Sequence, residues 1–144
     1  MITIFDLKTG NISSLKKTLD ILNIRNCVSD DPNELSKSSK IIIAGVGSFD
    51  NFMSRLEKNN VVDELKYQLI EKEKPFLGIC VGMQILLEKS EEGNKQGIGL
   101  IKGEVKKFKN DLNIRIPHMG WNYVNIKKKN KLIQLKNQTF INFL

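Results

Sequence analysis

One cysteine of this sequence lies in a pattern typical of covalent catalysis. Cys80 stands at the centre of Gly78-Ile79-Cys80-Val81-Gly82, the cysteine form of the G-x-S-x-G nucleophile elbow. In such an elbow the chain turns sharply from a strand into a helix, and the two glycines leave room for that turn. The sulfur then projects at a helix N-terminus, where the backbone N–H groups favour the reactive thiolate. We therefore predict that Cys80 is a nucleophile.

Backbone donors for a developing oxyanion are predicted next to this cysteine. The N–H of Val81, directly after the nucleophile, is the first donor. The second is expected from the glycine loop at residues 45–47, which follows another apolar run and so lies at the same edge of the sheet. Without these features Cys80 would be interpreted as a small buried hydrophobic residue, and that structural role is what we expect for Cys27.

A cysteine nucleophile also needs a base, and the sequence holds one histidine, His118. It lies in the turn-like segment 117–122, and nothing in the spacing pairs it with Cys80. We predict a structural or interface role for this segment, with Met119 and Trp121 as interface anchors, and the alternative is that His118 is the base. One histidine and two separated cysteines cannot supply a zinc ligand set, so we predict no metal and no cofactor.

The elements that position these residues alternate between strands and helices. Strands are expected at 2–6, 26–29, 40–44 and 75–80, and helices at 14–22 with Ser13 or Ser14 as cap, 33–36, 49–56, 61–70 and 83–89. The runs at 40–44 and 75–80 are continuously apolar, which is typical of strands buried on both faces. The alternation predicts an α/β fold with a doubly wound, mostly parallel sheet. After residue 97, short runs at 98–108, 114–117 and 123–126 predict antiparallel additions at the edge of that sheet.

The composition is that of a soluble globular protein. The 144 residues are 40% hydrophobic and 27% charged, which predicts a single domain. There is no apolar run long enough to span a bilayer and no signal-peptide pattern at the start, so we expect a cytoplasmic protein without a membrane partner. The two cysteines do not make a disulfide framework, which agrees with a reducing compartment.

The net charge of +7 comes from the second part of the chain. Residues 95–144 carry 11 Lys and Arg against 2 Asp and Glu, whereas residues 1–94 carry 12 against 14. Of the 23 basic residues, 20 are lysines, but contacts to phosphates and bases favour the arginine fork. We therefore expect a solvated lysine-rich surface and no nucleic-acid partner, with a basic face for a protein partner as the alternative.

Five segments, in order along the chain, resemble one known family. The segments are Ala-Gly-Val-Gly-Ser-Phe at 44–49, Gly-Ile-Cys-Val-Gly-Met-Gln at 78–84, Ser-Glu-Glu-Gly at 90–93, Gly-Ile-Gly-Leu-Ile-Lys-Gly at 97–103 and Pro-His-Met-Gly-Trp-Asn at 117–122. The second resembles the nucleophile motif of class I glutamine amidotransferases, and the first is similar to their oxyanion loop. Together the five resemble the amidotransferase subunits of imidazole glycerol phosphate synthases, which act in histidine biosynthesis.

The resemblance implies a flavodoxin-like amidotransferase domain and assigns roles within it. Cys80 is then the nucleophile that attacks the side-chain amide of glutamine. The N–H groups of Gly47 and Val81 form the oxyanion hole, and Gln84 and Glu92 hold the glutamine. The implied enzyme is a glutaminase that delivers its ammonia to a partner.

The implied partner is a cyclase subunit with a (β/α)₈ barrel fold, which receives the ammonia within a heterodimer. Met119 and Trp121 would lie near that partner. A paralogous amidotransferase serving an amidating enzyme of surface-sugar synthesis is one alternative function. A non-catalytic remnant that only binds the partner is the other.

The sequence also departs from the family pattern. The first loop reads Asp-Leu-Lys-Thr-Gly-Asn at 6–11 where the family has D-Y-G-x-G-N, and Ala44 replaces a proline of the oxyanion loop. The family's H-S-Y and H-P-E motifs, the second of which supplies the catalytic His and Glu, would follow Leu144. We therefore expect residues 1–144 to be a glutamine amidotransferase domain whose C-terminal part is missing, inactive alone and marginally stable.

Overall fold

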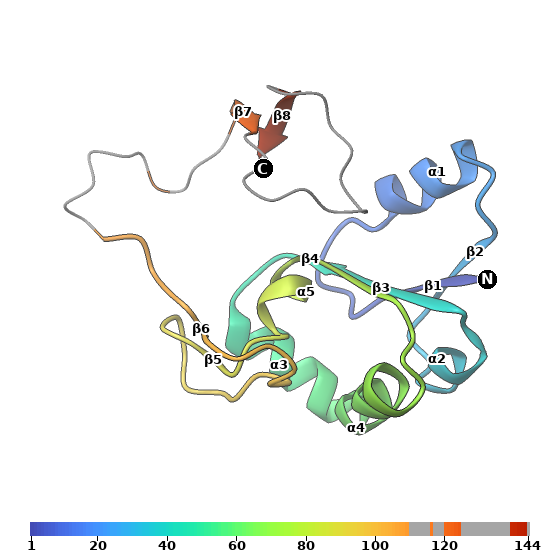
Figure 1. Ribbon diagram of the computed structural model, residues 1–144, viewed down its shortest axis with the longest axis horizontal. Coiled ribbons are helices and arrows are strands. Elements are labelled where there is room, and N and C mark those ends of the chain that lie inside the picture. Colours follow the sequence, from blue (N-terminus) through green and yellow to red (C-terminus); the bar gives the residue numbers. More distant parts are fainter. Residues whose placement is uncertain (110–115, 117–119, 125–138, 144) are drawn as a thin grey trace. The chain divides into compact units, whose positions relative to one another are not determined.

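The computed structural model describes residues 1–109, 116, 120–124 and 139–143 (Figure 1). The chain divides into two compact units, Met1–Lys107 and Phe108–Leu144. The first unit contains the glycine-flanked cysteine and the predicted α/β alternation, and the second contains a pair of strands. None of the described helices is long and apolar enough to cross a membrane.

The first unit is built on a four-stranded parallel sheet. Its strands are β1 (Ile2–Phe5), β2 (Asn26–Ser29), β3 (Lys40–Gly45) and β4 (Phe76–Cys80), in the order β2-β1-β3-β4. Each neighbouring pair is parallel. Parallel neighbours need crossover connections, which the helices between the strands provide. This arrangement confirms the predicted α/β fold and its parallel sheet.

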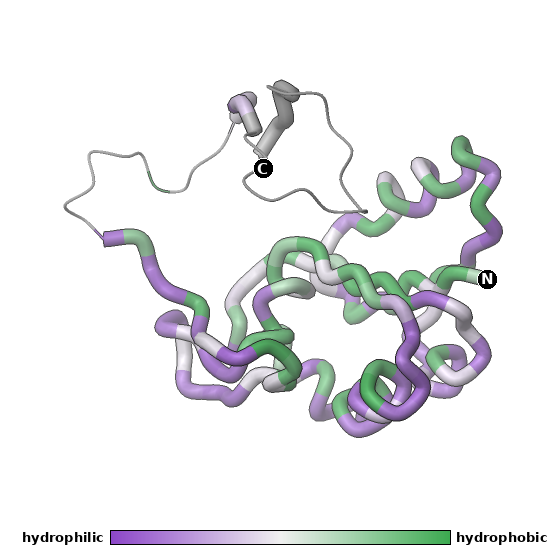
Figure 2. Tube along the Cα trace, in the orientation of Figure 1, coloured by the Kyte–Doolittle hydropathy of each residue, from purple (hydrophilic) through white to green (hydrophobic). Residues whose placement is uncertain are grey.

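Helices cover both faces of this sheet, as a doubly wound fold requires. They are α1 (Ser13–Ile21), α2 (Asn33–Lys37), α3 (Phe49–Lys58), α4 (Val61–Lys66) with the π-helical turn η1 (Tyr67–Glu71), and α5 (Val81–Gln84). On one face Leu19 of α1 packs against Ile4 and Ile42. The opposite face carries the larger core, in which Phe5 and Ile43 meet side chains of α2 to α5. Figure 2 shows the hydrophobic colouring following the strands between these layers.

Strand β4 is less buried than its apolar sequence predicts. Leu77 is 50% exposed and Ile79 is 38% exposed. Leu77 is the register partner of Ile42, but the cluster under α1 is centred on Ile4 and Ile42 and does not extend to β4. Within the described residues β4 also has a strand on one side only. The expectation of two covered faces therefore holds for β3 and is wrong for β4.

The helix after the cysteine is shorter than expected and begins earlier. It spans Val81–Gln84, whereas the sequence pattern predicts 83–89. The helix ends because the carbonyl groups of Ile85, Leu86 and Leu87 accept N–H groups from the segment 98–101, at 2.7, 2.9 and 3.2 Å. Carbonyls bonded to a distant segment are not available to continue a helix.

Two further predictions about local structure need correction. Helix α1 begins at Ser13 without a serine cap, because the side-chain oxygen of Asn11 accepts the N–H of Ser13 at 3.1 Å. The additions after residue 97 do not join the main sheet within the described residues. Strands β5 (Lys89–Ser90) and β6 (Glu104–Val105) form a separate pair that is parallel, so the antiparallel pairing expected for the run 98–108 is wrong.

The second unit contains β7 (Gly120–Val124) and β8 (Thr139–Phe143). These two strands pair antiparallel in a two-stranded sheet of their own, which confirms antiparallel pairing for this part of the chain. The predicted run at 114–117 lies outside the described residues except for residue 116.

Candidate active site

The backbone at Cys80 has the sharp turn that the glycine-flanked motif predicts. Its φ is 55° and its ψ is −119°, a conformation that residues other than glycine rarely adopt. Cys80 is the last residue of β4, and α5 starts at the next position. The residue is exposed. Backbone strain of this kind persists only where the surrounding structure enforces it, and it is concentrated at functional sites.

Two close backbone contacts explain the glycines on either side of the cysteine. A Cβ at Gly78 would lie 2.3 Å from the carbonyl oxygen of Gly82. A Cβ at Gly82 would lie 2.1 Å from the carbonyl oxygen of Ile43 in the neighbouring strand. Both distances are far below an ordinary contact, so only glycine fits. The pair therefore lets the chain fold back tightly and lifts Cys80 to the end of the sheet.

The predicted oxyanion loop ends the strand next to the cysteine. Gly45 of β3 is the register partner of Cys80, so the loop at 45–47 and the cysteine leave the sheet at the same edge. Gly47 has a φ of 117° and open space around it, a backbone conformation that favours glycine. The N–H of Val46 donates to the carbonyl of Thr9 at 3.2 Å, which ties the first loop of the chain to this one.

The two predicted glutamine-binding residues are in different environments. Gln84 ends α5, and its buried Oε1 has no hydrogen-bond partner within the described part of the chain. Glu92 is exposed and lies in the loop after β5, where its N–H donates to the Ser90 hydroxyl at 3.1 Å. The structure thus places Gln84 one helical turn after Cys80, and Glu92 on a separate loop.

Sequence reasoning missed a carboxylate that binds this loop. Asp50, in the first turn of α3, accepts the N–H groups of Asn94 and Lys95, each at 3.0 Å. These two backbone hydrogen bonds hold the pKa of the Asp50 carboxyl below its ordinary value. The sequence shows Asp50 only as an acidic residue two positions after Ser48, the observed N-cap of α3. Its hydrogen-bond partners lie 44 and 45 residues later in the chain, so no local pattern connects them to it.

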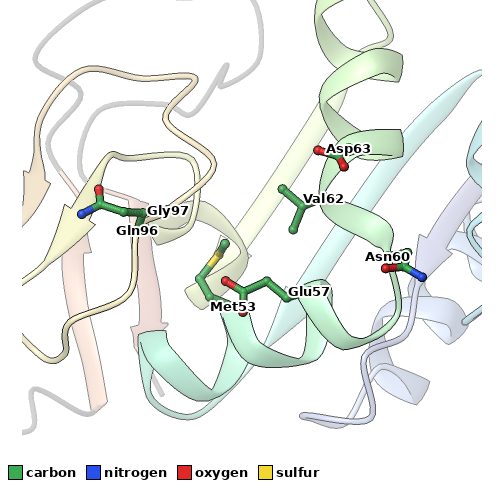
Figure 3. A pocket seen from close by; sticks show the side chains of 7 residues that line it. All are labelled: Met53, Glu57, Asn60, Val62, Asp63, Gln96 and Gly97. Carbon is green, nitrogen blue, oxygen red and sulfur yellow. The ribbon is translucent and has the colours of Figure 1, made fainter.

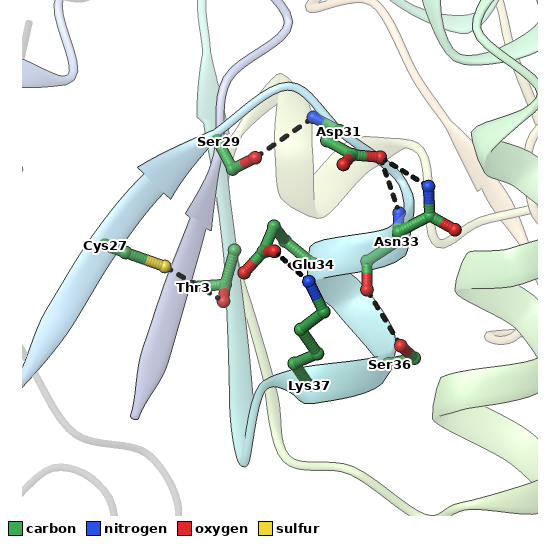
Figure 4. A network of polar contacts seen from close by, with 8 residues as sticks. All are labelled: Thr3, Cys27, Ser29, Asp31, Asn33, Glu34, Ser36 and Lys37. Atoms are coloured by element: carbon green, nitrogen blue, oxygen red, sulfur yellow. Dashed lines mark hydrogen bonds and ion pairs between the residues drawn. The ribbon is translucent and has the colours of Figure 1, made fainter.

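Cys27 has the structural environment expected for it. Its sulfur lies 3.4 Å from the Thr3 hydroxyl, across the pairing of β1 with β2 (Figure 4). The same figure shows that the neighbouring polar contacts fix the turn into α2, where Asp31 accepts the backbone N–H of Asn33 at 2.9 Å. These contacts belong to the fold and provide no reactive group.

A pocket of about 340 Å³ lies between α3, α4 and the segment after β5 (Figure 3). It is separate from the cysteine elbow, because neither the elbow nor the oxyanion loop contributes to its lining. The lining residues are Met53, Glu57, Asn60, Val62, Asp63, Gln96 and Gly97.

The predicted interface residues are only partly described. Trp121 lies in β7 and is 64% exposed. His118 and Met119 lie outside the described residues, so their predicted roles are not tested by this structure.

Comparison with known proteins identifies the family. The family model for class-I glutamine amidotransferases matches residues 9–143. The chain belongs to that family. Among solved structures, one described as a glutamine amidotransferase superposes with a TM-score of 0.65 at 17% identity, covering 85% of this chain and 62% of the other. This likeness supports the flavodoxin-like fold of the family.

Three similar amidotransferases are each named as imidazole glycerol phosphate synthase subunit HisH. The form numbered 1 in Campylobacter jejuni strain 81-176 is 43% identical over 93% of this chain and 67% of its own length. The protein of Pyrococcus furiosus is 42% identical over 99% of this chain and 69% of its own length. That of Thermosynechococcus vestitus is 41% identical, and the match covers 60% of its length. The chain thus spans roughly two thirds of these relatives.

Proposed function

We propose that this amidotransferase hydrolyses glutamine through Cys80. The observation that carries the proposal is the strained backbone of Cys80, whose φ of 55° and ψ of −119° lie outside the left-handed helical region, between two glycines at which a Cβ would clash with backbone atoms. Backbone strain of this kind is concentrated at active sites and ligand-binding sites. Cys80 is exposed at the end of the sheet, where a substrate can reach it.

The chemistry follows from the groups at this edge of the sheet. The Cys80 thiolate attacks the side-chain carbonyl carbon of glutamine, and the carbonyl oxygen gains a negative charge. The N–H groups of Val81 and Gly47 stabilise this oxyanion. The C–N bond breaks, the nitrogen takes up a proton and leaves as ammonia, and an acyl thioester remains on the sulfur. Water then hydrolyses the thioester to glutamate and restores the thiol.

Gln84 and Glu92 hold the substrate in this proposal. The buried Oε1 of Gln84 lacks a partner, and an unsatisfied buried acceptor costs about 1–3 kcal/mol. A donor group on the bound substrate supplies the missing partner. The exposed Glu92 carboxylate attracts the positively charged amino group of glutamine.

We also propose the partner and the pathway. The relatives are named as subunits of imidazole glycerol phosphate synthase, and this favours histidine biosynthesis over the surface-sugar alternative. The ammonia then goes to a cyclase subunit with a (β/α)₈ barrel, with Met119 and Trp121 at the interface. The two free cysteines, Cys27 and Cys80, suit the reducing cytoplasm.

Labelling the thiols tests the nucleophile. A glutamine analogue with a chloromethyl ketone in place of the side-chain amide should alkylate Cys80, with loss of chloride, and leave Cys27 unmodified. Mass spectrometry of the intact and digested chain measures both. The Cys80→Ser variant should stay unlabelled, and the matched Cys27→Ser variant should react like the wild type. Equal labelling of the two cysteines would refute the proposal.

Glutamine turnover by residues 1–144 is a separate expectation. Thioester chemistry needs a base to move protons, and the one histidine, His118, matches a position that the family does not use as a base. We therefore propose that this polypeptide releases no glutamate above background, even with a cyclase subunit present. Release at enzyme-like rates would overturn this expectation and make His118 the base.

A further inference from the structure

One side chain joins the helix that follows the oxyanion loop to the loop that carries Glu92. Asp50 lies in the first turn of α3, directly after the loop at 45–47. Its Oδ2 accepts the N–H of Asn94 and its Oδ1 accepts the N–H of Lys95, both at 3.0 Å. Hydrogen bonds to an ionised acceptor are stronger than neutral ones. Two of them on consecutive residues fix both the position and the orientation of this backbone.

The contact is also too tight for a side chain on the loop. A Cβ at Gly93 would lie 2.1 Å from Oδ1 and 2.4 Å from Oδ2 of Asp50. The backbone of the loop therefore lies directly against the Asp50 carboxylate, and this close contact is possible because residue 93 is a glycine. An ion pair between Lys95 and Glu57, near the C-terminal end of α3, strengthens the same attachment.

Other contacts fix the residues on the opposite side of Glu92. The Glu91 carboxylate accepts the amine of Lys106 and the backbone N–H of Lys107, both at 2.8 Å. The Ser90 hydroxyl accepts the N–H of Glu92 at 3.1 Å. The carboxylate of Glu92 itself makes no hydrogen bond or ion pair within the part of the chain that the structure describes. The loop is held on both sides and presents one unpaired carboxylate.

We propose that Asp50 is a positioning residue for substrate binding: it holds the loop 90–95 against α3 so that Glu92 faces the amino group of glutamine. The inference rests on the proposed function, because it takes Glu92 as the group that binds this amine. Asp50 itself touches no substrate. It sets the spacing between the oxyanion loop, which precedes its helix, and the carboxylate of the neighbouring loop.

The Asp50→Asn variant tests the role of the second acceptor oxygen. An asparagine keeps the shape but turns one acceptor into an N–H₂ donor, which then faces a backbone N–H. In the 144-residue chain, we expect a roughly tenfold rise in the concentration of the chloromethyl ketone analogue at which the rate of Cys80 alkylation is half its maximum. The maximal rate of inactivation and the rate with iodoacetamide, which lacks the amino group, should stay unchanged. Hydrogen exchange of the Asn94 and Lys95 amides should become faster.

Two further variants test the same contact, one by disturbing it and one as a control. Gly93→Ala should weaken analogue binding from the other side of the same contact, because its Cβ displaces the Asp50 carboxylate. Glu57→Gln removes the ion pair with Lys95 but keeps the two hydrogen bonds from Asn94 and Lys95 to Asp50. It should therefore change analogue binding much less than Asp50→Asn does.

The outcomes separate the two proposals. An unchanged half-maximal concentration in Asp50→Asn, or an equal loss of reactivity with iodoacetamide, would assign Asp50 a structural role only. Equal labelling of Cys27 and Cys80 in the wild-type chain would instead overturn the proposed function, and this inference with it. Selective labelling of Cys80 without saturation would overturn this inference alone.

Discussion

The Gly82→Ala substitution gives the sharpest test of the elbow. Its new methyl group would lie 2.1 Å from the Ile43 carbonyl oxygen and 2.9 Å from the Ile43 carbonyl carbon. An ordinary contact between carbon and oxygen is about 3.4 Å, so α5 or β3 must move by about 1 Å. Ile43 is held in the sheet between Phe5 and Gly78, and a backbone group cannot rotate away like a side chain. We expect a loss at the upper end of the range for overpacking, about 3 kcal/mol.

Thermal unfolding followed by circular dichroism measures this loss. About 3 kcal/mol corresponds to a decrease in Tm of roughly 10 °C for a chain of this length. Gly99→Ala is the matched control, because Gly99 has a φ of 73° but open space around it. Its cost is the backbone strain alone, about 1 kcal/mol. If Gly82→Ala lost no more stability than Gly99→Ala, the close contact would not be what requires a glycine at this position.

Three other measurements follow from the structure. Backbone N–H groups lower the pKa of Asp50, so its stabilising effect is present above the ordinary aspartate pKa and is lost as the pH falls through the lowered value. The difference in unfolding free energy between wild type and Asp50→Asn should therefore be constant near neutral pH and shrink in acid, as urea titrations at several pH values would show. Leu56 is fully buried, and Leu56→Ala should cost about 3 kcal/mol in the same titrations; a cost below about 1 kcal/mol would contradict its place in the core. Trp121→Ala should weaken association with a cyclase subunit, measured by calorimetry, more than it lowers the Tm, and unchanged affinity would remove Trp121 from the interface.

The order of elements in the first unit was predictable because each signal is local. Strands β1 to β4 and helices α1 to α4 occur where apolar runs and helical periodicity predict them. The ends of elements were less predictable, because distant partners set them. The helix after Cys80 stops at Gln84 since residues 98–101 bond the next carbonyl groups. The exposure of Leu77 likewise depends on how far α1 extends across the sheet.

The elbow was visible in the sequence for a similar reason. Five consecutive residues contain the nucleophile, its donor and the glycines that the turn requires, so the pattern and the geometry coincide. The reason for each glycine was only partly visible. The pattern predicts that Gly78 and Gly82 avoid crowding near the cysteine, but the atom that excludes a side chain at Gly82 belongs to Ile43, in another strand.

Asp50 shows what such a pattern cannot contain. Near the start of a helix an aspartate is already favoured by the exposed N–H groups and the helix dipole, so its residue type alone gives no sign of a second role. Its carboxylate instead bonds a loop 44 residues later, and the glycine that permits this contact, Gly93, resembles any turn glycine in the sequence. The two positions become related only when the chain is folded. A glycine that lies too close to a charged side chain to carry a Cβ therefore reveals this kind of positioning contact, which neither residue indicates by itself.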